Sequence, residues 1–182
     1  LMDKEQGDEI KTAANVHVDD SLGVGSQLGL DKIRKSMARV FELKTTKNPT
    51  LVVGVQIERV RSAKWLKIHL EGYVITLLGK YSMLDSKTAT TPMDAGIMKE
   101  KVEPYNTVDT KQDLQDRKEF QEVYASLLWL VIKCRPDLFI VINYFGRHLK
   151  TARARELKLI KGQPLRYLNG TRDYGLVYCS GN

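Results

Sequence analysis

The sequence predicts an α+β protein, with strands and helices in its first part and a mostly helical second part. Two observations carry this prediction. Apolar and polar residues alternate between residues 51 and 70, as they do in half-buried strands. From residue 119 onward, apolar residues return at the spacing of a helix. The composition, 42% hydrophobic and 28% charged over 182 residues, is that of a globular protein with one good-sized core or two small ones.

A short hairpin is the first predicted element. Ala13 to Val18 contains β-branched valines and reads as a strand that ends in an acidic turn, and Ser21 to Val24 could be its return strand. Ser26 then suits the N-cap of a helix. We expect the apolar face of that helix to carry Ile33, Met37, Val40 and Phe41.

A second hairpin and a helix follow. Leu51 to Val60 alternates as one strand, Arg61-Ser62-Ala63 is a polar break, and Leu66 to Leu70 gives the second arm. The helix after it places four apolar or aromatic residues one above another: Tyr73, Leu77, Leu78 and Tyr81.

The C-terminal half is predicted to be a long loop followed by helices. Asp85 to Lys118 is rich in polar residues and shows no apolar period, so we interpret it as a linker or exposed loop. The expected helices are Glu119 to Lys133, Asp137 to Lys150 and roughly Arg153 to Leu168, the last broken near Gly162 and restarted at Pro164. Asn169-Gly170 is expected to form a turn, and Gly175 to Cys179 a strand.

Positive charge is concentrated in one segment. Between residues 147 and 172 the only acid is Glu156, and the basic excess there equals the net charge of the whole chain, +7. A localised excess of this kind indicates a polyanion partner, although a solvated helix face would give the same pattern. The eight basic residues are Arg147, Lys150, Arg153, Arg155, Lys158, Lys161, Arg166 and Arg172.

Several classes of protein are disfavoured. The longest apolar run, Leu127 to Ile132, has six residues against the roughly 18 that span a membrane, and the charged N-terminus offers no signal-peptide core. We therefore expect no membrane partner and an intracellular location, in the cytoplasm or the nucleus. The two cysteines, Cys134 and Cys179, are too few for a disulfide framework and suit buried free thiols. Because the first residue is not Met, we expect the chain to be cut from something longer.

The segment with the clearest chemical potential is Val16-His17-Val18-Asp19-Asp20. At a hairpin turn, two adjacent carboxylates can approach one point, where they repel each other unless a cation lies between them. That makes the pair a candidate Mg²⁺ site for two-metal phosphoryl transfer. Such a site usually needs a third carboxylate, and the sequence shows no obvious one. Asp and Ser are also ordinary turn formers, so a plain hairpin turn remains the alternative.

Five short segments, taken in order, resemble the reverse transcriptases of copia-type retrotransposons. That family has a Tyr-Val-Asp-Asp turn, a strand like Leu-Gly-Ile-Glu-Val, a Thr-Pro-Met segment, a Tyr-x-Ser-Leu helix leading to Arg-Pro-Asp, and Leu-Arg-Tyr-Leu-Lys-Gly-Thr. The similar segments here start at His17, Val53, Thr90, Tyr124 and Leu165, and they cover nearly the whole chain.

The resemblance implies an RNA-directed DNA polymerase with palm, fingers and thumb, which uses Mg²⁺ to extend a primer on a template. Residues 1–70 would be part of the palm with its primer-side hairpin, residues 71–118 a thumb-like helix and linker, and residues 119–182 a connection leading toward a ribonuclease H domain. Asp19 would be the main catalytic metal ligand and Asp20 its neighbour. The partners would be the template–primer duplex and the rest of the Pol polyprotein. Contacts to the duplex would come from Trp65, Lys67, Arg147, Arg153, Arg155, Lys158, Lys161 and Arg166.

The sequence departs from the family pattern at His17, where the family has Tyr. The fingers and the other palm carboxylate cannot fit into the 16 residues before it, so we expect the isolated chain to be inactive as a polymerase. The alternatives are a non-enzymatic basic nucleic-acid-binding remnant, and a product with no retained role.

Overall fold

A computed structural model describes residues 12–17, 20–99 and 105–179, and the structural statements below concern these residues. The chain divides into two compact units, which we call the N-terminal unit (Leu1–Val53) and the C-terminal unit (Gly54–Asn182). The α+β class and the mostly helical C-terminal region are confirmed. The three-part division that the resemblance implies concerns roles within a longer polymerase, and it stays a prediction.

The N-terminal unit contains a hairpin and one helix. Its elements are β1 (Thr12–His17), β2 (Asp20–Gly25), α1 (Gln27–Met37) and β3 (Leu51–Val52). β1 and β2 pair antiparallel, with His17 opposite Asp20, so the hairpin predicted at the acidic turn is confirmed. The N-cap prediction is also confirmed, because the Ser26 hydroxyl accepts a hydrogen bond from the backbone N–H of Gly29 at 3.2 Å.

The predicted apolar face of α1 is wrong at its C-terminal end. The helix stops at Met37, and Val40 and Phe41 lie beyond it with 75% and 62% of their surface exposed. A helix gains most of its stability from burying an apolar face. No residue of α1 is buried, so a further helical turn would gain no stability from burial of apolar side chains in α1.

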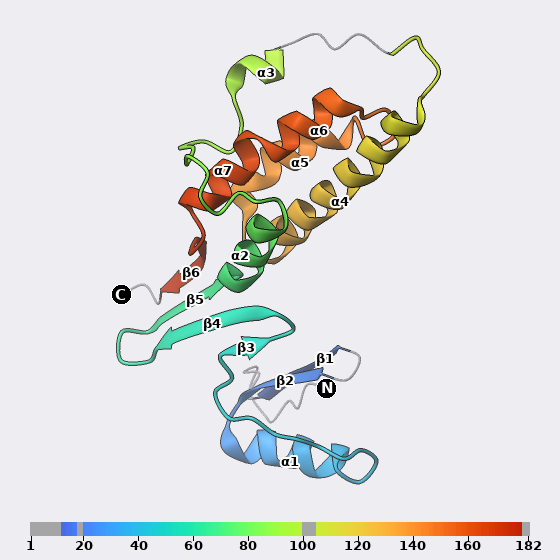
Figure 1. Cartoon of the computed structure of the whole chain (residues 1–182). Helices are drawn as coiled ribbons and strands as arrows, with labels where there is room; N and C mark the ends of the chain where they lie inside the picture. The colour runs from blue at the N-terminus through green and yellow to red at the C-terminus, as the bar shows by residue number, and fades with distance from the viewer. Residues whose placement is uncertain (1–11, 18–19, 100–104, 180–182) are drawn as a thin grey trace. The chain divides into compact units, whose positions relative to one another are not determined.

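The C-terminal unit combines a three-stranded sheet with a helical body (Figure 1). β5 (Trp65–His69) lies between β4 (Val55–Val60) and β6 (Gly175–Cys179), and both pairings are antiparallel. The helices are α2 (Glu71–Lys80), α3 (Ala95–Lys99), α4 (Lys111–Lys133), a 3₁₀ turn (Pro136–Leu138), α5 (Phe139–Gly146), α6 (Ala154–Lys161) and α7 (Gln163–Gly170).

One strand prediction is corrected. Leu51 to Val60 is not continuous, because Val53 and Gly54 adopt positive φ values of 47° and 76° and separate β3 from β4. This conformation is easy for glycine but strained for a β-branched residue, at a cost on the order of 1–3 kcal/mol. Alternation of apolar residues continues through the turn, so periodicity alone could not reveal it.

The loop predicted from Asp85 to Lys118 is wrong in two places, because it contains the short helix α3 and because α4 begins within it, at Lys111. Thr110 and Asp113 form a capping box there: the Thr110 hydroxyl accepts the Asp113 N–H at 3.1 Å, and the Asp113 carboxylate accepts the Thr110 N–H at 2.9 Å. Two of the helix's unpaired donors are thereby satisfied. The first turns of α4 are polar in sequence and gave no apolar signal.

Of the remaining predicted boundaries, some are confirmed and others are wrong. The break near Gly162 is confirmed, since α6 ends at Lys161 and α7 restarts with Pro164 in its first turn. The helix predicted from Asp137 to Lys150 ends earlier, at Gly146. Asn169 and Gly170 belong to α7 and not to a turn. Strand β6 matches the predicted range.

The core of the C-terminal unit lies among the helices. α4 packs against α5 and α6, α2 packs against α7, and Figure 1 shows the long α4 running beside the two helices that follow it. At its centre the ring of Phe120 meets the ring of Phe145 edge-on, with centroids 5.9 Å apart. Each fully buried large apolar side chain contributes about 1.5–3 kcal/mol. The completely buried members include Leu78, Phe120, Val123, Leu127, Leu130, Val141, Ile160, Leu165 and Leu168.

A buried arginine joins two segments that are far apart in the sequence. Arg135, 1% exposed, donates from Nε and Nη2 to Asp137 at 3.0 and 2.8 Å. It also donates to the carbonyl and the hydroxyl of Thr171 at 2.8 and 2.7 Å. The Tyr167 hydroxyl donates to Asp137 at 2.8 Å, which completes the group. We call these four residues the Arg135 cluster. A buried charge is tolerated when it is paired and hydrogen-bonded, and here each of the three guanidinium nitrogens donates at least one hydrogen bond.

Two smaller findings bear on the sequence predictions. Cys134 is buried, as expected for a structural thiol, whereas Cys179 is exposed. Among the described residues, no helix combines the length and the apolar character needed to cross a membrane.

Candidate nucleic-acid and metal sites

The acidic turn is described in part. Asp20 is the first residue of β2 and is exposed, while Val18 and Asp19 lie outside the described residues. In the described part of the chain, no three His, Cys, Asp or Glu residues gather into a group that could hold a metal ion. Mg²⁺ takes several oxygen ligands in near-octahedral geometry. The described residues therefore do not fit a complete Mg²⁺ site, and the assignment of Asp19 and Asp20 as metal ligands stays a prediction.

Trp65 and Lys67 lie on the middle strand of the sheet and are half-buried. They alternate with Ile68, which packs against the helical core, so they occupy the other face of the sheet. Lys67 lies opposite Glu58 on β4 and opposite Val177 on β6. A basic side chain on this face is available for a partner only in part, and its predicted contact with a duplex is untested.

The basic segment divides into engaged and unengaged residues. Four of its side chains bond within the chain: Arg153 to Asp109, Arg155 to Glu156, Lys161 to Glu119, and Arg172 to Asn169 and the Leu84 carbonyl. The other four form no hydrogen bond or ion pair with a described residue, and all are exposed: Arg147, Lys150, Lys158 and Arg166. The structure thus divides the eight basic residues of this segment into a group whose side chains are held within the chain and a group of exposed side chains.

Arg153 is the most constrained of the engaged group. Its side chain is 14% exposed and lies 3.0 Å from Asp109, and it donates to the Thr107 carbonyl at 2.7 Å. Its guanidinium also stacks 4.4 Å from the centroid of the Tyr105 ring. These bonds tie the segment before α4 to the start of α6. We interpret Arg153 first as a structural residue, because a phosphate would have to compete with partners already in place.

Glu156 supports the same junction from within the protein. It is 1% exposed and accepts hydrogen bonds from the Tyr105 hydroxyl at 2.9 Å, the Arg153 N–H at 3.1 Å and the Arg155 guanidinium at 3.0 Å. Burial raises the pKa of this carboxyl, but those hydrogen bonds outweigh burial, so the pKa lies below its usual value. The acid in the middle of the basic segment is therefore ionised and neutralises part of it.

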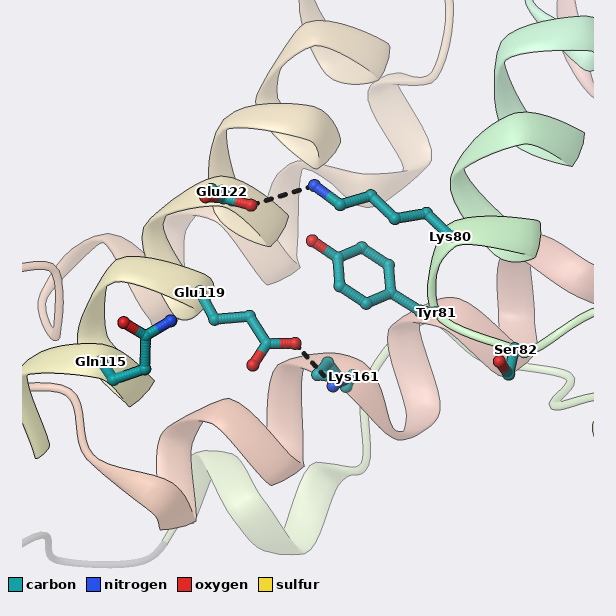
Figure 2. Close-up of a pocket in the computed structure, with 7 residues that line it drawn as sticks. All are labelled: Lys80, Tyr81, Ser82, Gln115, Glu119, Glu122 and Lys161. Carbon is teal, nitrogen blue, oxygen red and sulfur yellow. Dashed lines mark hydrogen bonds and ion pairs between the residues drawn. The ribbon is translucent and has the colours of Figure 1, made fainter. Parts of the chain in front are cut away.

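Lys161 borders a second feature, a pocket of about 420 Å³ among α2, α4 and α6. Figure 2 shows Tyr81 between two ion pairs, Lys80–Glu122 at 2.9 Å and Lys161–Glu119 at 2.8 Å. Both ammonium groups also lie near the Tyr81 ring, at 5.3 and 5.1 Å from its centroid. Burial raises the pKa of the Tyr81 phenol. Because each cation is paired with its own carboxylate, the charges that line the pocket are balanced. The two ion pairs connect α4 with α2 and with α6.

Sequence reasoning missed the role of Arg135 and Thr171. Both were noticed only as parts of motifs, yet the structure makes them bonding partners within the Arg135 cluster. A signal was available: Arg135 follows the buried-thiol candidate Cys134 near the end of an apolar helix, and a buried arginine requires acceptors. Identifying the acceptors on Thr171 needs the fold, because that residue is 36 residues away in the sequence.

The chain is similar to curated retrovirus-related Pol polyproteins from transposons. It is 26% identical over 157 residues to the polyprotein of transposon TNT 1-94 from Nicotiana tabacum, covering 86% of this chain. It is 28% identical over 168 residues to that of transposon RE2 from Arabidopsis thaliana, covering 92% of this chain, and 26% identical to that of transposon RE1. The match spans 12%, 11% and 11% of the three relatives' own length. No protein-family model and no solved structure matches the chain.

Proposed function

We propose that this chain is part of the RNA-directed DNA polymerase of a copia-type retrotransposon, from the acidic palm hairpin through the connection. One observation carries the proposal. In a chain whose homologues are Pol polyproteins, residues on both sides of the Val18-Asp19 segment pair as a hairpin, with His17 opposite Asp20. A polymerase palm needs its acids at such a bend, because regular strand would point adjacent carboxylates to opposite faces.

The chain's own residues would take two roles. Asp19 and Asp20 would contribute ligands for Mg²⁺, which in the complete enzyme would lower the cost of the charge that develops during nucleotide addition. The unengaged cations of the C-terminal unit, among them Arg147 and Lys158, would hold the phosphate backbone of the template–primer duplex. Such contacts are independent of base sequence and sensitive to salt.

Segment exchange tests the polymerase proposal. The matched 157-residue segment of the TNT 1-94 polyprotein would be replaced by this chain and assayed for primer extension with Mg²⁺. We expect extension to survive the exchange and to fall at least about 100-fold in Asp19→Asn or Asp20→Asn, since removing one charge-stabilising group at a reacting centre commonly costs that much. Asp31→Asn is the matched control, because Asp31 is an acid of the same unit that pairs with Arg34 at 3.4 Å.

Two results would count against the proposal. Extension by the exchanged polyprotein that is indifferent to both turn substitutions would remove the role of the acidic turn. Robust extension by the isolated chain would show that no further carboxylate is required. Circular dichroism of each variant distinguishes a catalytic loss from misfolding.

A second candidate function is a non-enzymatic nucleic-acid-binding remnant. It is favoured by the separation within the molecule: the C-terminal unit has its own buried core and carries the unengaged cations, and neither depends on the acidic turn. It predicts duplex binding that weakens steeply with salt and is unchanged in Asp19→Ala. Binding that is the same at low and high salt would rule it out.

A further inference from the structure

A basic cleft of about 530 Å³ opens on the C-terminal unit, between the segment before α4, α4 itself and the turn after α5. Its charged lining is one-sided. Four cations, Arg117, Arg147, Lys150 and Arg153, face it together with a single carboxylate, that of Asp109. Sequence reasoning placed Arg117 in a linker and did not connect it with the basic segment, from which it is separated by most of α4.

The single carboxylate is shared between two arginines. Asp109 lies 2.8 Å from Arg117 Nη2 and 3.0 Å from Arg153 Nη2. The side chains of both arginines are largely buried, 17% and 14% exposed. Asp109 therefore fixes the two guanidinium groups in the wall, and a second carboxylate, that of Asp113, lies 3.8 Å from Arg153 Nε. These two acids balance the two arginines, so the net positive charge of the cleft comes from Arg147 and Lys150 on its rim.

Hydrogen-bond donors are left over in the same wall. The Nε atoms of Arg117 and Arg153 are both buried and have no hydrogen-bond partner among the described residues. The nearest carboxylate oxygen to Arg153 Nε belongs to Asp113 and lies 3.8 Å away, too far for a hydrogen bond. A buried guanidinium donor without an acceptor costs free energy. An anion in the cleft would place acceptor oxygens beside the guanidinium groups of both residues.

The rim of the cleft supplies the cations that are free to move toward such an anion. Arg147 and Lys150 are exposed, and no hydrogen bond or ion pair joins their side chains to a described residue. His148 also lines the cleft, but burial, and the positive charges of Arg155 and Arg147, hold its pKa below the usual value. The imidazole is therefore neutral at pH 7. The attraction would come from the arginines and Lys150.

We infer that this cleft binds consecutive phosphate groups of a nucleic-acid backbone. Guanidinium groups match phosphate oxygens in geometry and keep their charge at every physiological pH. A volume of about 530 Å³ lies in the range of sites for sizeable ligands and exceeds what one inorganic phosphate ion needs. The choice of nucleic acid as the source of the phosphates rests on the proposed function, whereas the anion site itself rests on the cleft.

The test compares two double variants of the full chain that lose the same charge. Arg147→Gln/Lys150→Gln removes the rim of the cleft, and Lys87→Gln/Lys99→Gln removes two exposed lysines outside it. Binding of a fluorescein-labelled RNA–DNA hybrid is followed by anisotropy between about 50 and 200 mM salt. We expect the cleft variant to bind about tenfold more weakly, with the slope of log K against log salt reduced by about two. The control should stay within about twofold of the unmodified chain.

Competition identifies the ligand. Inorganic phosphate and polyglutamate, added at the same concentration of negative charge as unlabelled hybrid, should displace the probe far less well than the hybrid does. Equal losses in the two variants would overturn the cleft assignment while leaving duplex binding, and so the proposed function, in place. Displacement by polyglutamate as effective as by hybrid would overturn the phosphate assignment. No binding of the hybrid by the unmodified chain would overturn both proposals.

Discussion

The two units of the chain differ in how far they bury their apolar side chains. In the C-terminal unit, residues from five helices enclose a continuous core, in which Phe120, Leu127 and Leu168 are completely buried. In the N-terminal unit, Thr12 is the one buried residue in the described part. Large apolar side chains there stay exposed, among them Val24 at 70%, Leu28 at 69% and Val40 at 75%.

Because of this difference, the residues that stabilise the fold and the acidic turn lie in different units. The acidic turn belongs to the unit without a core, whereas the packed unit carries the basic segment between residues 147 and 172. A hairpin and one helix cannot bury enough apolar surface to offset the entropy of ordering them. We therefore expect the C-terminal unit to unfold cooperatively and to account for nearly all of the measured stability.

Phe120→Ala should produce the largest effect. Removing a fully buried ring that contacts Phe145 should lower the free energy of unfolding by about 3–5 kcal/mol. Phe41→Ala is the matched substitution in the N-terminal unit, where the ring is 62% exposed, and it should cost less than about 0.5 kcal/mol. Urea unfolding followed by circular dichroism measures both. Similar costs for the two variants would contradict the comparison.

Arg135→Met should come next, at about 3 kcal/mol. The substitution keeps a long side chain but removes the guanidinium donors from the Thr171 carbonyl and from Asp137, which keeps the hydrogen bond from the Tyr167 hydroxyl. Arg34→Met in the N-terminal unit breaks only an ion pair whose side chains are 54% and 38% exposed, so its cost should be near zero. Thermal unfolding of the two variants beside the parent chain is sufficient. If Arg34→Met is as harmful as Arg135→Met, the cluster has no special weight.

Loss of a helix cap should have a smaller effect on stability, and it should show whether the two units unfold together. Thr110→Ala removes one half of the capping box of α4 and should lower the global stability by about 1 kcal/mol. Ser26→Ala removes the cap of α1, but we expect it to leave the main transition unmoved and to speed amide exchange within Gln27–Met37. Hydrogen exchange read by mass spectrometry resolves both regions. A shifted main transition in Ser26→Ala would show that the units unfold together.

The last prediction concerns Glu156→Gln, whose cost in stability should be present at neutral pH and disappear in acid. Hydrogen bonds hold the folded pKa of this carboxyl below its unfolded value, so it stabilises the fold above the unfolded value. That contribution is lost as the pH falls through the folded pKa. Glu156→Gln should therefore flatten the decline of stability below about pH 5. Stability curves of parent and variant that stay parallel down to pH 2 would contradict this assignment.

The sequence predicted a helix or strand boundary well where residues at that boundary determine it. Ser26 marked the start of α1, Gly162 and Pro164 marked the break before α7, and Gly175 to Cys179 matched β6. The same reasoning failed at Val53, whose positive φ follows no side-chain preference. It also failed at Lys111, where a polar first turn is held by Thr110 and Asp113.

Of the candidate sites, the sequence predicted the hairpin at the acidic turn and the residues of the basic segment. It could not predict that Arg153 would be held by Asp109 while Arg147 stays exposed, because Asp109 comes from a different part of the chain. Nor could it place Arg117 beside Arg153, since their proximity depends on how α4 packs against α6.

The Arg135 cluster also sets a limit on how far the protein can be shortened. A fragment that ends before Thr171 would still bury the Arg135 guanidinium among helices. It would lack the Thr171 carbonyl and hydroxyl, which accept hydrogen bonds from that guanidinium. Such a fragment would expel the charge by opening the end of α4, and we expect it to aggregate when expressed. A minimal recombinant version should run from β4 at least through this threonine, whether or not the acidic hairpin is retained.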